Sequence, residues 1–116
     1  MAYQVKYKLT SFMLPDKDDW ASVAEFKEYH DNDGGVARRA GSVAEKHDFK
    51  DEITNGQAKY KSADTVFSLE SGAVFMTCTY NSESDYISST ADYKTARAAA
   101  GIDRRTKSEV VSETEV

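Results

Sequence analysis

The single cysteine of this chain, Cys78, is the residue best suited to nucleophilic chemistry. It lies in the segment GAVFMTCTY, in phase with Val74 and Met76. Side chains two residues apart in a strand share one face, so Cys78 belongs to an apolar face, where a thiol is poorly ionised. No histidine or basic residue stands near it in the sequence to activate it. We therefore expect a buried, inert cysteine.

The two histidines of the chain do not have the spacing of a metal site, since neither HxH nor HxxxH occurs. The segment HDNDGG places Asp31, Asp33 and Gly34 at the third, fifth and sixth positions of a calcium-binding loop. Tyr29 and Ala40 would then occupy its first and last positions, and neither supplies a carboxylate. We expect no metal and no cofactor, with each histidine capping or bordering an apolar face.

Aromatic side chains on a strand raise the alternative of RNA recognition. RNA-recognition motifs read bases from aromatic residues on the third strand of their sheet, and Phe75 and Tyr80 follow a glycine here. Glu70 and Ser71 stand where that motif has a basic residue, and the formal net charge of −5 repels phosphate. A solvated edge strand explains the one basic cluster, DRRTK. RNA binding is the less favoured alternative, and we expect no nucleic-acid partner.

Length and composition indicate one ordinary globular domain over residues 1–116, with 40% hydrophobic residues. No run of about 18 apolar residues exists to span a bilayer. The first residues alternate polar and apolar, unlike a secretory signal. One cysteine forms no internal disulfide, which favours a reduced, cytoplasmic protein. The acidic charge favours neutral, apolar or cationic partners over a membrane surface.

The elements that position these residues begin with a strand. Tyr3, Val5, Tyr7 and Leu9 alternate with polar residues, which is the period of a half-buried strand. We expect a strand over residues 3–10.

A helix follows the only proline. Asp16 is the expected N-cap, and acidic residues follow it in the first turn. Trp20, Val23, Phe26 and His30 are spaced three, three and four residues apart, as on one helical face. The glycines of DNDGG end this helix.

The middle of the chain predicts extended structure with two turns. Residues 36–48 fit either a helix or a strand, and we favour the strand. Asn55-Gly56 is a strong hairpin signal, which predicts that one extended arm folds back there. The apolar runs 65–69 and 73–80 flank a turn at Ser71-Gly72 and predict a second hairpin.

The last third of the chain contains the clearest helix signal. Ser82 begins a capping-box variant, which predicts a helix over about 83–100 with Tyr86 and Tyr93 on one face. Gly101 ends it. The segment IDRRTKSEVV alternates as a closing strand does, and residues 112–116, SETEV, read as a polar tail.

The element order predicts an α+β protein of the ferredoxin-like βαββαβ type, an antiparallel sheet with two helices on one face. The Tyr-rich first strand, the Trp20 and Phe26 helix and the segment GAVFMTCTYNSESDYISSTADYKTARAA resemble the dimeric ferredoxin-like (dimeric α+β barrel) proteins. Ser82 to Tyr86 matches their Ser-x-x-x-Tyr helix start. That family includes the antibiotic-biosynthesis-monooxygenase type, and the chain also resembles uncharacterised proteins of marine phage and metagenomic origin.

The resemblance implies a homodimer and a pocket between the sheet and the helices. An uncovered sheet face with large apolar side chains favours a sheet-to-sheet dimer. Its candidate interface residues are Tyr3, Phe12 and Phe75. The candidate pocket residues are Tyr7, Trp20, Phe26, His30, Met76 and Tyr86.

Two main functional hypotheses follow from this reading, and a third, a phage or virion-associated interaction protein, is not separable from the first by sequence. The first is a non-enzymatic homodimeric module that holds an apolar small molecule or fatty ligand between sheet and helices. The second is a cofactor-free monooxygenase-like enzyme of the same fold, for which the sequence offers no assigned catalytic residue. A stripe of Trp, Val and Phe is more typical of a core or an apolar cavity than of a catalytic constellation, so we lean towards the first.

Overall fold

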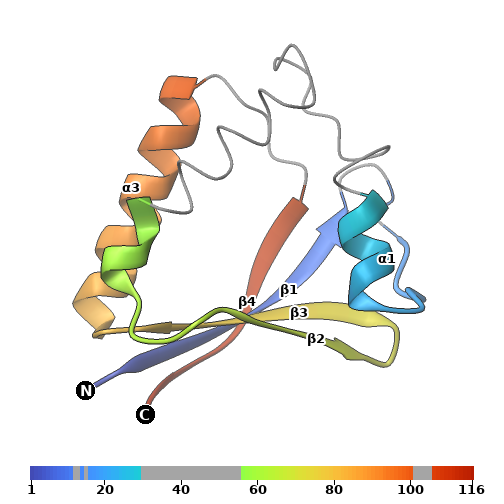
Figure 1. The fold of residues 1–116 in the computed structure, drawn as a ribbon, viewed down its shortest axis with the longest axis horizontal. Helices are drawn as coiled ribbons and strands as arrows, with labels where there is room; N and C mark the ends of the chain where they lie inside the picture. Colours follow the sequence, from blue (N-terminus) through green and yellow to red (C-terminus); the bar gives the residue numbers. More distant parts are fainter. Residues whose placement is uncertain (12–13, 15, 30–55, 101–105) are drawn as a thin grey trace.

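The computed structural model describes residues 1–11, 14, 16–29, 56–100 and 106–116. The fold is α+β, with a four-stranded antiparallel sheet and the helices α1 (Val23–Glu28) and α3 (Glu83–Ala100) on the same side of it (Figure 1). The strands are β1 (Tyr3–Ser11), β2 (Val66–Glu70), β3 (Ala73–Tyr80) and β4 (Thr106–Glu115). Their order in the sheet is β2-β3-β1-β4, which is compatible with the βαββαβ pattern.

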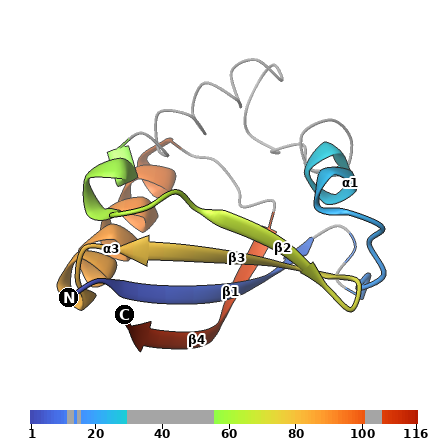
Figure 2. The same ribbon diagram turned by 60° about the horizontal axis from the view of Figure 1, so that its bottom comes forward.

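The hairpin of β2 and β3 turns at Ser71 and Gly72, as the sequence predicts. Both residues have positive φ, 52° and 83°, as a two-residue type I′ turn requires. The turn lies against the segment that leads into α1, because the Trp20 backbone N–H donates to the Gly72 carbonyl at 2.9 Å. This end of the sheet and the start of α1 are therefore tied together (Figure 2).

β1 lies between β3 and β4 and pairs with both along its length. Lys6 pairs with Ser112 and Tyr7 with Val110, so Val111 is an extra residue in β4 and forms a bulge. The prediction of a polar tail at 112–116 is wrong, because the strand continues to Glu115. The alternation of apolar and polar residues does not predict this part of the strand, because the segment has no apolar face. Its strand conformation comes from pairing with β1.

α1 begins later than the sequence predicts. Its N-cap is Ser22 and not Asp16: the Ser22 hydroxyl accepts from the Glu25 N–H at 3.0 Å, and the Glu25 carboxylate accepts from the Ala21 N–H at 2.9 Å. This reciprocal pair is a variant of the capping box. Trp20 therefore precedes the helix instead of belonging to its stripe.

α3 has the bounds that the sequence predicts. The Ser82 hydroxyl caps it by accepting from the Asp85 N–H at 3.1 Å, and Glu83 and Asp85 lie in its first turn. Tyr86 packs against the sheet, whereas Tyr93, expected on the same face, is 41% exposed.

Residues 56–60 are helical, so the arm expected to extend from Asn55-Gly56 is not a strand. Gly56 and Gln57 form a turn of helix that leads into the 3-10 helix η2 (Ala58–Tyr60). Side chains hold this segment on α3: the Ser89 hydroxyl donates to Gln57, and the Tyr60 hydroxyl donates to Asp92. Asn55 itself, residues 36–48 and Gly101 lie outside the described residues.

Candidate functional site

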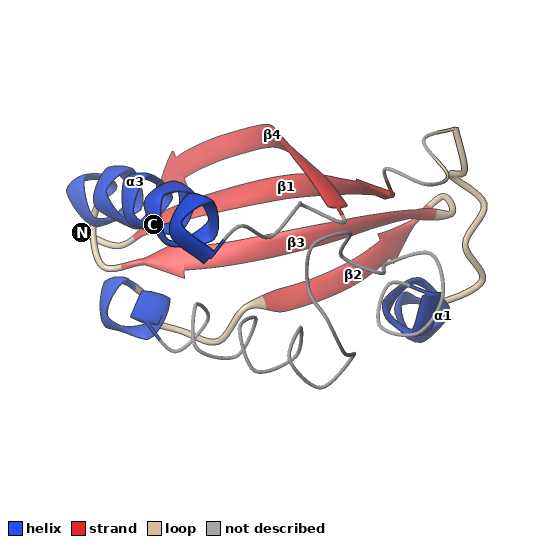
Figure 3. Cartoon of the chain, turned by 90° about the horizontal axis from the view of Figure 1, so that it is seen from above, coloured by secondary structure: helices blue, strands red, loops and turns tan. Residues whose placement is uncertain are grey.

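The helix-facing side of the sheet carries two separate clusters of buried side chains. Figure 3 shows α3 and α1 over opposite ends of the sheet, and each end has its own cluster. The α3-end cluster consists of Tyr3, Val5, Cys78 and Tyr80. The α1-end cluster consists of Leu9, Trp20, Phe26 and Val74.

A row of four side chains crosses the sheet between these clusters. Phe67 pairs with Met76, Met76 with Tyr7, and Tyr7 with Val110, so all four share the helix-facing side. Tyr7 and Met76 pack against both clusters, yet they and Phe67 are only partly buried, and Val110 is 42% exposed. We call these four residues the cross-strand row, and it forms an incompletely covered apolar strip in mid-sheet.

The pocket residues predicted from the sequence lie in different parts of this surface. Tyr7 and Met76 belong to the cross-strand row, and Tyr86 packs on the α3-end cluster. The two other described candidates belong to the α1-end cluster: Trp20 and Phe26. The structure thus brings Tyr7 and Met76 together and places Tyr86 and Trp20 at opposite ends.

Tyrosine side chains link the row to the α3-end cluster. The hydroxyl oxygens of Tyr7 and Tyr80 lie 3.3 Å apart. The Tyr86 ring lies 5.2 Å from that of Tyr80 and is stacked 5.6 Å from that of Tyr3. The Tyr3 hydroxyl donates to Glu113 Oε1 at 2.9 Å. Phenol hydroxyls therefore lie where the row meets the α3-end cluster.

These phenols are held in their neutral form. Burial raises the pKa of Tyr80 to about 12. Burial, together with the hydrogen bond to Glu113, raises the pKa of Tyr3 to about 12. Burial and the Tyr80 hydroxyl raise the pKa of Tyr7 well above its usual range. At neutral pH the three phenols are therefore uncharged hydrogen-bonding groups and cannot act as general bases.

Cys78 is buried, as the sequence predicts, with 2% of its surface exposed. Its sulfur lies 3.9 Å from the Thr65 hydroxyl, which is a weak polar contact. The residue packs in the α3-end cluster beneath the aromatic rings and is part of the core.

Two lysines lie over aromatic rings at the α1 end of the sheet. Lys27 Nζ lies 3.9 Å from the centre of the Phe67 ring, and Lys17 Nζ lies 4.8 Å from that of Trp20. Lys17 is also paired with Asp19 at 2.8 Å. Lys27 makes no ion pair with any residue that the structure describes. A cation that no described carboxylate pairs with therefore lies at one end of the cross-strand row.

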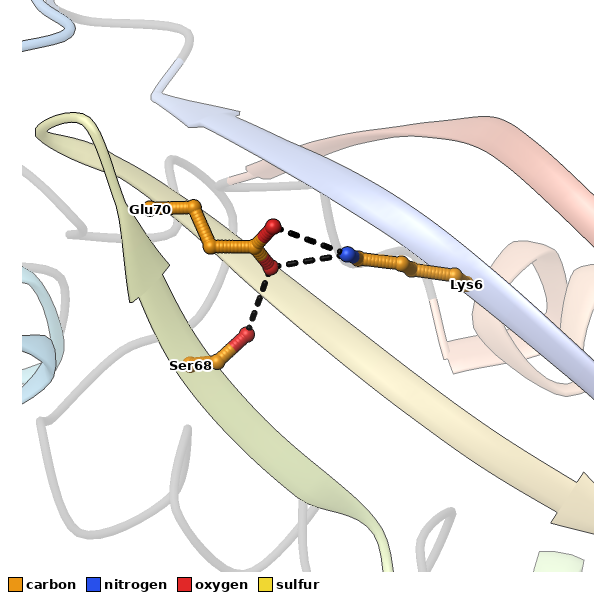
Figure 4. A network of polar contacts seen from close by, with 3 residues as sticks. All are labelled: Lys6, Ser68 and Glu70. Carbon is orange, nitrogen blue, oxygen red and sulfur yellow. Dashed lines mark hydrogen bonds and ion pairs between the residues drawn. The ribbon is translucent and has the colours of Figure 1, made fainter.

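The other face of the sheet is polar. Lys6 pairs with Glu70 at 2.8 Å, Ser68 donates to the same carboxylate at 3.1 Å (Figure 4), and Lys6 also lies 4.7 Å over the Phe75 ring. By register, most other side chains of this face are also polar, for example Gln4, Lys8, Thr10, Thr77, Thr79, Ser112 and Thr114. We call this the open face.

The candidate dimer residues do not share one surface. Tyr3 lies on the helix-facing side, where it stacks on Tyr86, whereas Phe75 lies on the open face. Phe12 lies outside the described residues. Only Phe75 therefore retains the position that a sheet-to-sheet interface requires, and a homodimer stays a prediction.

Sequence reasoning missed three residues of the site, namely Phe67, Val110 and Lys27. Phe67 and Val110 lie on predicted strands, but their place beside Tyr7 depends on cross-strand register, which the chain order does not reveal. Nothing in the sequence marks Lys27 as a site residue, except that it lies near the end of the first helix.

Within residues 1–11, 14, 16–29, 56–100 and 106–116, no three His, Cys, Asp or Glu side chains gather to hold a metal ion. No helix in the described part of the chain is long and apolar enough to cross a membrane. The histidines, His30 and His47, lie outside these ranges.

Comparison with known proteins returned no match: no family model, no curated protein and no solved structure is significantly similar to this chain.

Proposed function

We propose that this protein is a non-enzymatic binding module that holds an apolar small molecule against the cross-strand row, between the sheet and the helices. The observation that carries the proposal is the incompletely buried strip formed by Tyr7, Met76, Phe67 and Val110 between two separate clusters of buried side chains. Sites for small molecules are mostly apolar and contain a few well-placed polar groups. Here the phenol hydroxyl of Tyr7 is such a group, and the Tyr80 hydroxyl 3.3 Å away holds it in place.

The chemistry of the strip supports binding. Met76 is central to it, and an unbranched thioether adapts its shape to different apolar ligands. The aromatic rings of Tyr7 and Phe67 flank it and supply large flat contact surfaces. A cofactor-free monooxygenase-like enzyme is the alternative, but it requires a base, and the raised pKa of Tyr7 opposes that role for the nearest titratable group.

We propose further that the fold is ferredoxin-like. The sheet order β2-β3-β1-β4 and the placement of α1 and α3 on one side both support this class. In such a fold the helix-facing side of β1 and β3 forms the floor of any internal site, and this is the side that carries Tyr7 and Met76.

Nile red, a neutral dye that fluoresces in apolar surroundings, tests the proposal. We expect the wild-type protein to bind it with an apparent affinity in the micromolar range, and Met76→Gln to weaken binding about tenfold. Glutamine is close to methionine in size, but its amide has no partner against an apolar ligand, at a cost of about 1–3 kcal/mol.

Thr77→Gln is the matched control, because it adds the same side chain at the next position of β3 but on the open face. It should leave dye binding unchanged. Circular dichroism melts of both variants report whether they are folded. No binding by the wild type, or equal weakening by the two folded variants, would contradict the proposal.

A further inference from the structure

We propose that the ligand of the cross-strand row is a medium- or long-chain monocarboxylic acid, whose alkyl chain lies along the row and whose carboxylate pairs with Lys27. This inference rests on the proposed function, since it names the chemical class of the ligand for the same site. It uses two observations that the proposed function does not need, namely the length of the row and the position of the Lys27 ammonium group.

The row has the shape of an alkyl chain. It crosses four strands in register, from Phe67 through Met76 and Tyr7 to Val110. Neighbouring strands lie about 4.8 Å apart, so three spacings give a strip of roughly 14 Å. An extended hydrocarbon chain covers such a narrow strip, whereas a compact ring system covers only part of it.

The row has a charged end and an uncharged end. Lys27 Nζ lies 3.9 Å over the Phe67 ring, which is the first residue of the row. Val110 at the other end is an exposed aliphatic side chain. A molecule with an anionic head and an apolar tail therefore matches the row in one orientation, with its head at Phe67.

Lys27 is the lysine best placed for this role among those that lie over aromatic rings. Lys17 is paired with Asp19, and Lys6 is paired with Glu70 on the open face. Lys59 lies 5.0 Å over Tyr60, whose hydroxyl donates to Asp92, so an acid already lies near it at the α3 end. Lys27 lies over the row itself and forms no ion pair with any described residue.

The net charge of the chain limits how much the ligand carboxylate can improve affinity. A net charge of −5 opposes an anionic ligand, although salt screens this repulsion over about 8–10 Å. An exposed ion pair is weak. We therefore expect the carboxylate to improve affinity only severalfold, with most of the affinity supplied by the apolar chain.

The test compares dodecanoic acid with dodecanol, which share a chain and differ in head-group charge. Binding is followed by the fluorescence of Trp20, the only tryptophan of the chain, which packs in the cluster next to Met76 and Tyr7. At about pH 8 the acid is ionised. We expect the acid to bind up to about fivefold more tightly than the alcohol, and this preference to shrink as sodium chloride is added.

Lys27→Met and Lys59→Met separate the possible outcomes. Lys27→Met keeps an apolar stem over Phe67 and should remove the preference for the acid without weakening dodecanol, whereas Lys59→Met should leave the preference intact. Equal binding of acid and alcohol by the wild type, or a preference that survives Lys27→Met, overturns the head-group assignment and leaves the proposed function standing. Failure of both ligands to bind overturns the proposed function as well.

Discussion

The hydroxyl oxygens of Tyr7 and Tyr80 lie 3.3 Å apart on neighbouring strands, where the cross-strand row meets the α3-end cluster. One residue borders the proposed ligand and the other belongs to the core. Their contact therefore couples the ionisation of the site to the stability of the fold.

The buried phenols should make stability fall in strong alkali. The folded pKa of Tyr80 is about 12 against an ordinary value of 10.0, and that of Tyr7 is also raised, mainly by burial. Above pH 10 the unfolded chain therefore binds fewer protons than the folded one, and the free energy of unfolding decreases as pH rises from about 10 through about 12. Below pH 10 these phenols contribute their full stabilisation.

Near-ultraviolet absorbance during alkaline titration, with and without urea, measures this effect. We expect part of the signal of the seven tyrosines to titrate late in the folded protein and at the ordinary pKa in urea. Seven phenols that all ionise at the ordinary value while circular dichroism still reports a folded chain would contradict the prediction.

Gly72→Ala should strongly destabilise the protein. Gly72 has a φ of 83°, and a Cβ atom there would lie 2.3 Å from the Asp18 carbonyl oxygen. Both the conformation and the contact oppose a side chain, so we expect a loss of more than about 1 kcal/mol in the free energy of unfolding, measured with urea.

Gly56→Ala is the control for this substitution. A Cβ at Gly56 would meet no atom within 4 Å, and the residue is helical, where alanine is favoured over glycine. Its stability should be unchanged or higher. A Gly72→Ala protein as stable as Gly56→Ala would show that the turn does not contact the chain before α1.

Ser82→Ala should cost about 1 kcal/mol, because the Ser82 hydroxyl caps α3 by accepting from the Asp85 N–H. Ser84→Ala removes the same hydroxyl group from the second residue of α3, which is exposed. It should lower the free energy of unfolding by less. Urea midpoints of the two variants give the comparison, and equal midpoints would argue against the cap.

Phe75→Asp tests the homodimer that the family resemblance implies. Phe75 is the described interface candidate on the open face, and an added carboxylate there would oppose a twofold interface by bringing like charges together. If the homodimer forms through this face, sedimentation equilibrium gives twice the chain mass for the wild type and the single chain mass for the variant. A wild type that stays monomeric at all concentrations rejects the dimer.

Local patterns predicted much of the fold. The alternation around Tyr7, the turn at Ser71-Gly72 and the Ser82 cap each depend on residues close together in sequence, and the structure confirms them. The predicted N-cap of α1 at Asp16 was wrong, because Ser22 and Glu25 form a reciprocal cap six residues later.

Long-range pairing explains what the sequence could not predict. Residues 112–115 are polar on both sides, so only their hydrogen bonds to β1 reveal a strand. Gly56 belongs to a hairpin signal, yet Gly56 and Gln57 are helical, and Ser89 on α3 donates to the Gln57 side chain. In the candidate site, the sequence predicted Tyr7 and Met76. It could not predict that Phe67 and Val110 lie beside them, because that depends on the register between strands.

The central position of β1 has a consequence for how the chain folds. Both partners of β1 come much later in the sequence: Leu9 pairs with Val74, and Tyr3 pairs with Tyr80 on one side and Glu115 on the other. During synthesis β1 leaves the ribosome before β3 and β4, so its pairing in this sheet waits until these strands follow. Contacts between residues so far apart in sequence slow folding. A chain that ends before β4 also leaves β1 as an unprotected edge strand, which favours aggregation over refolding.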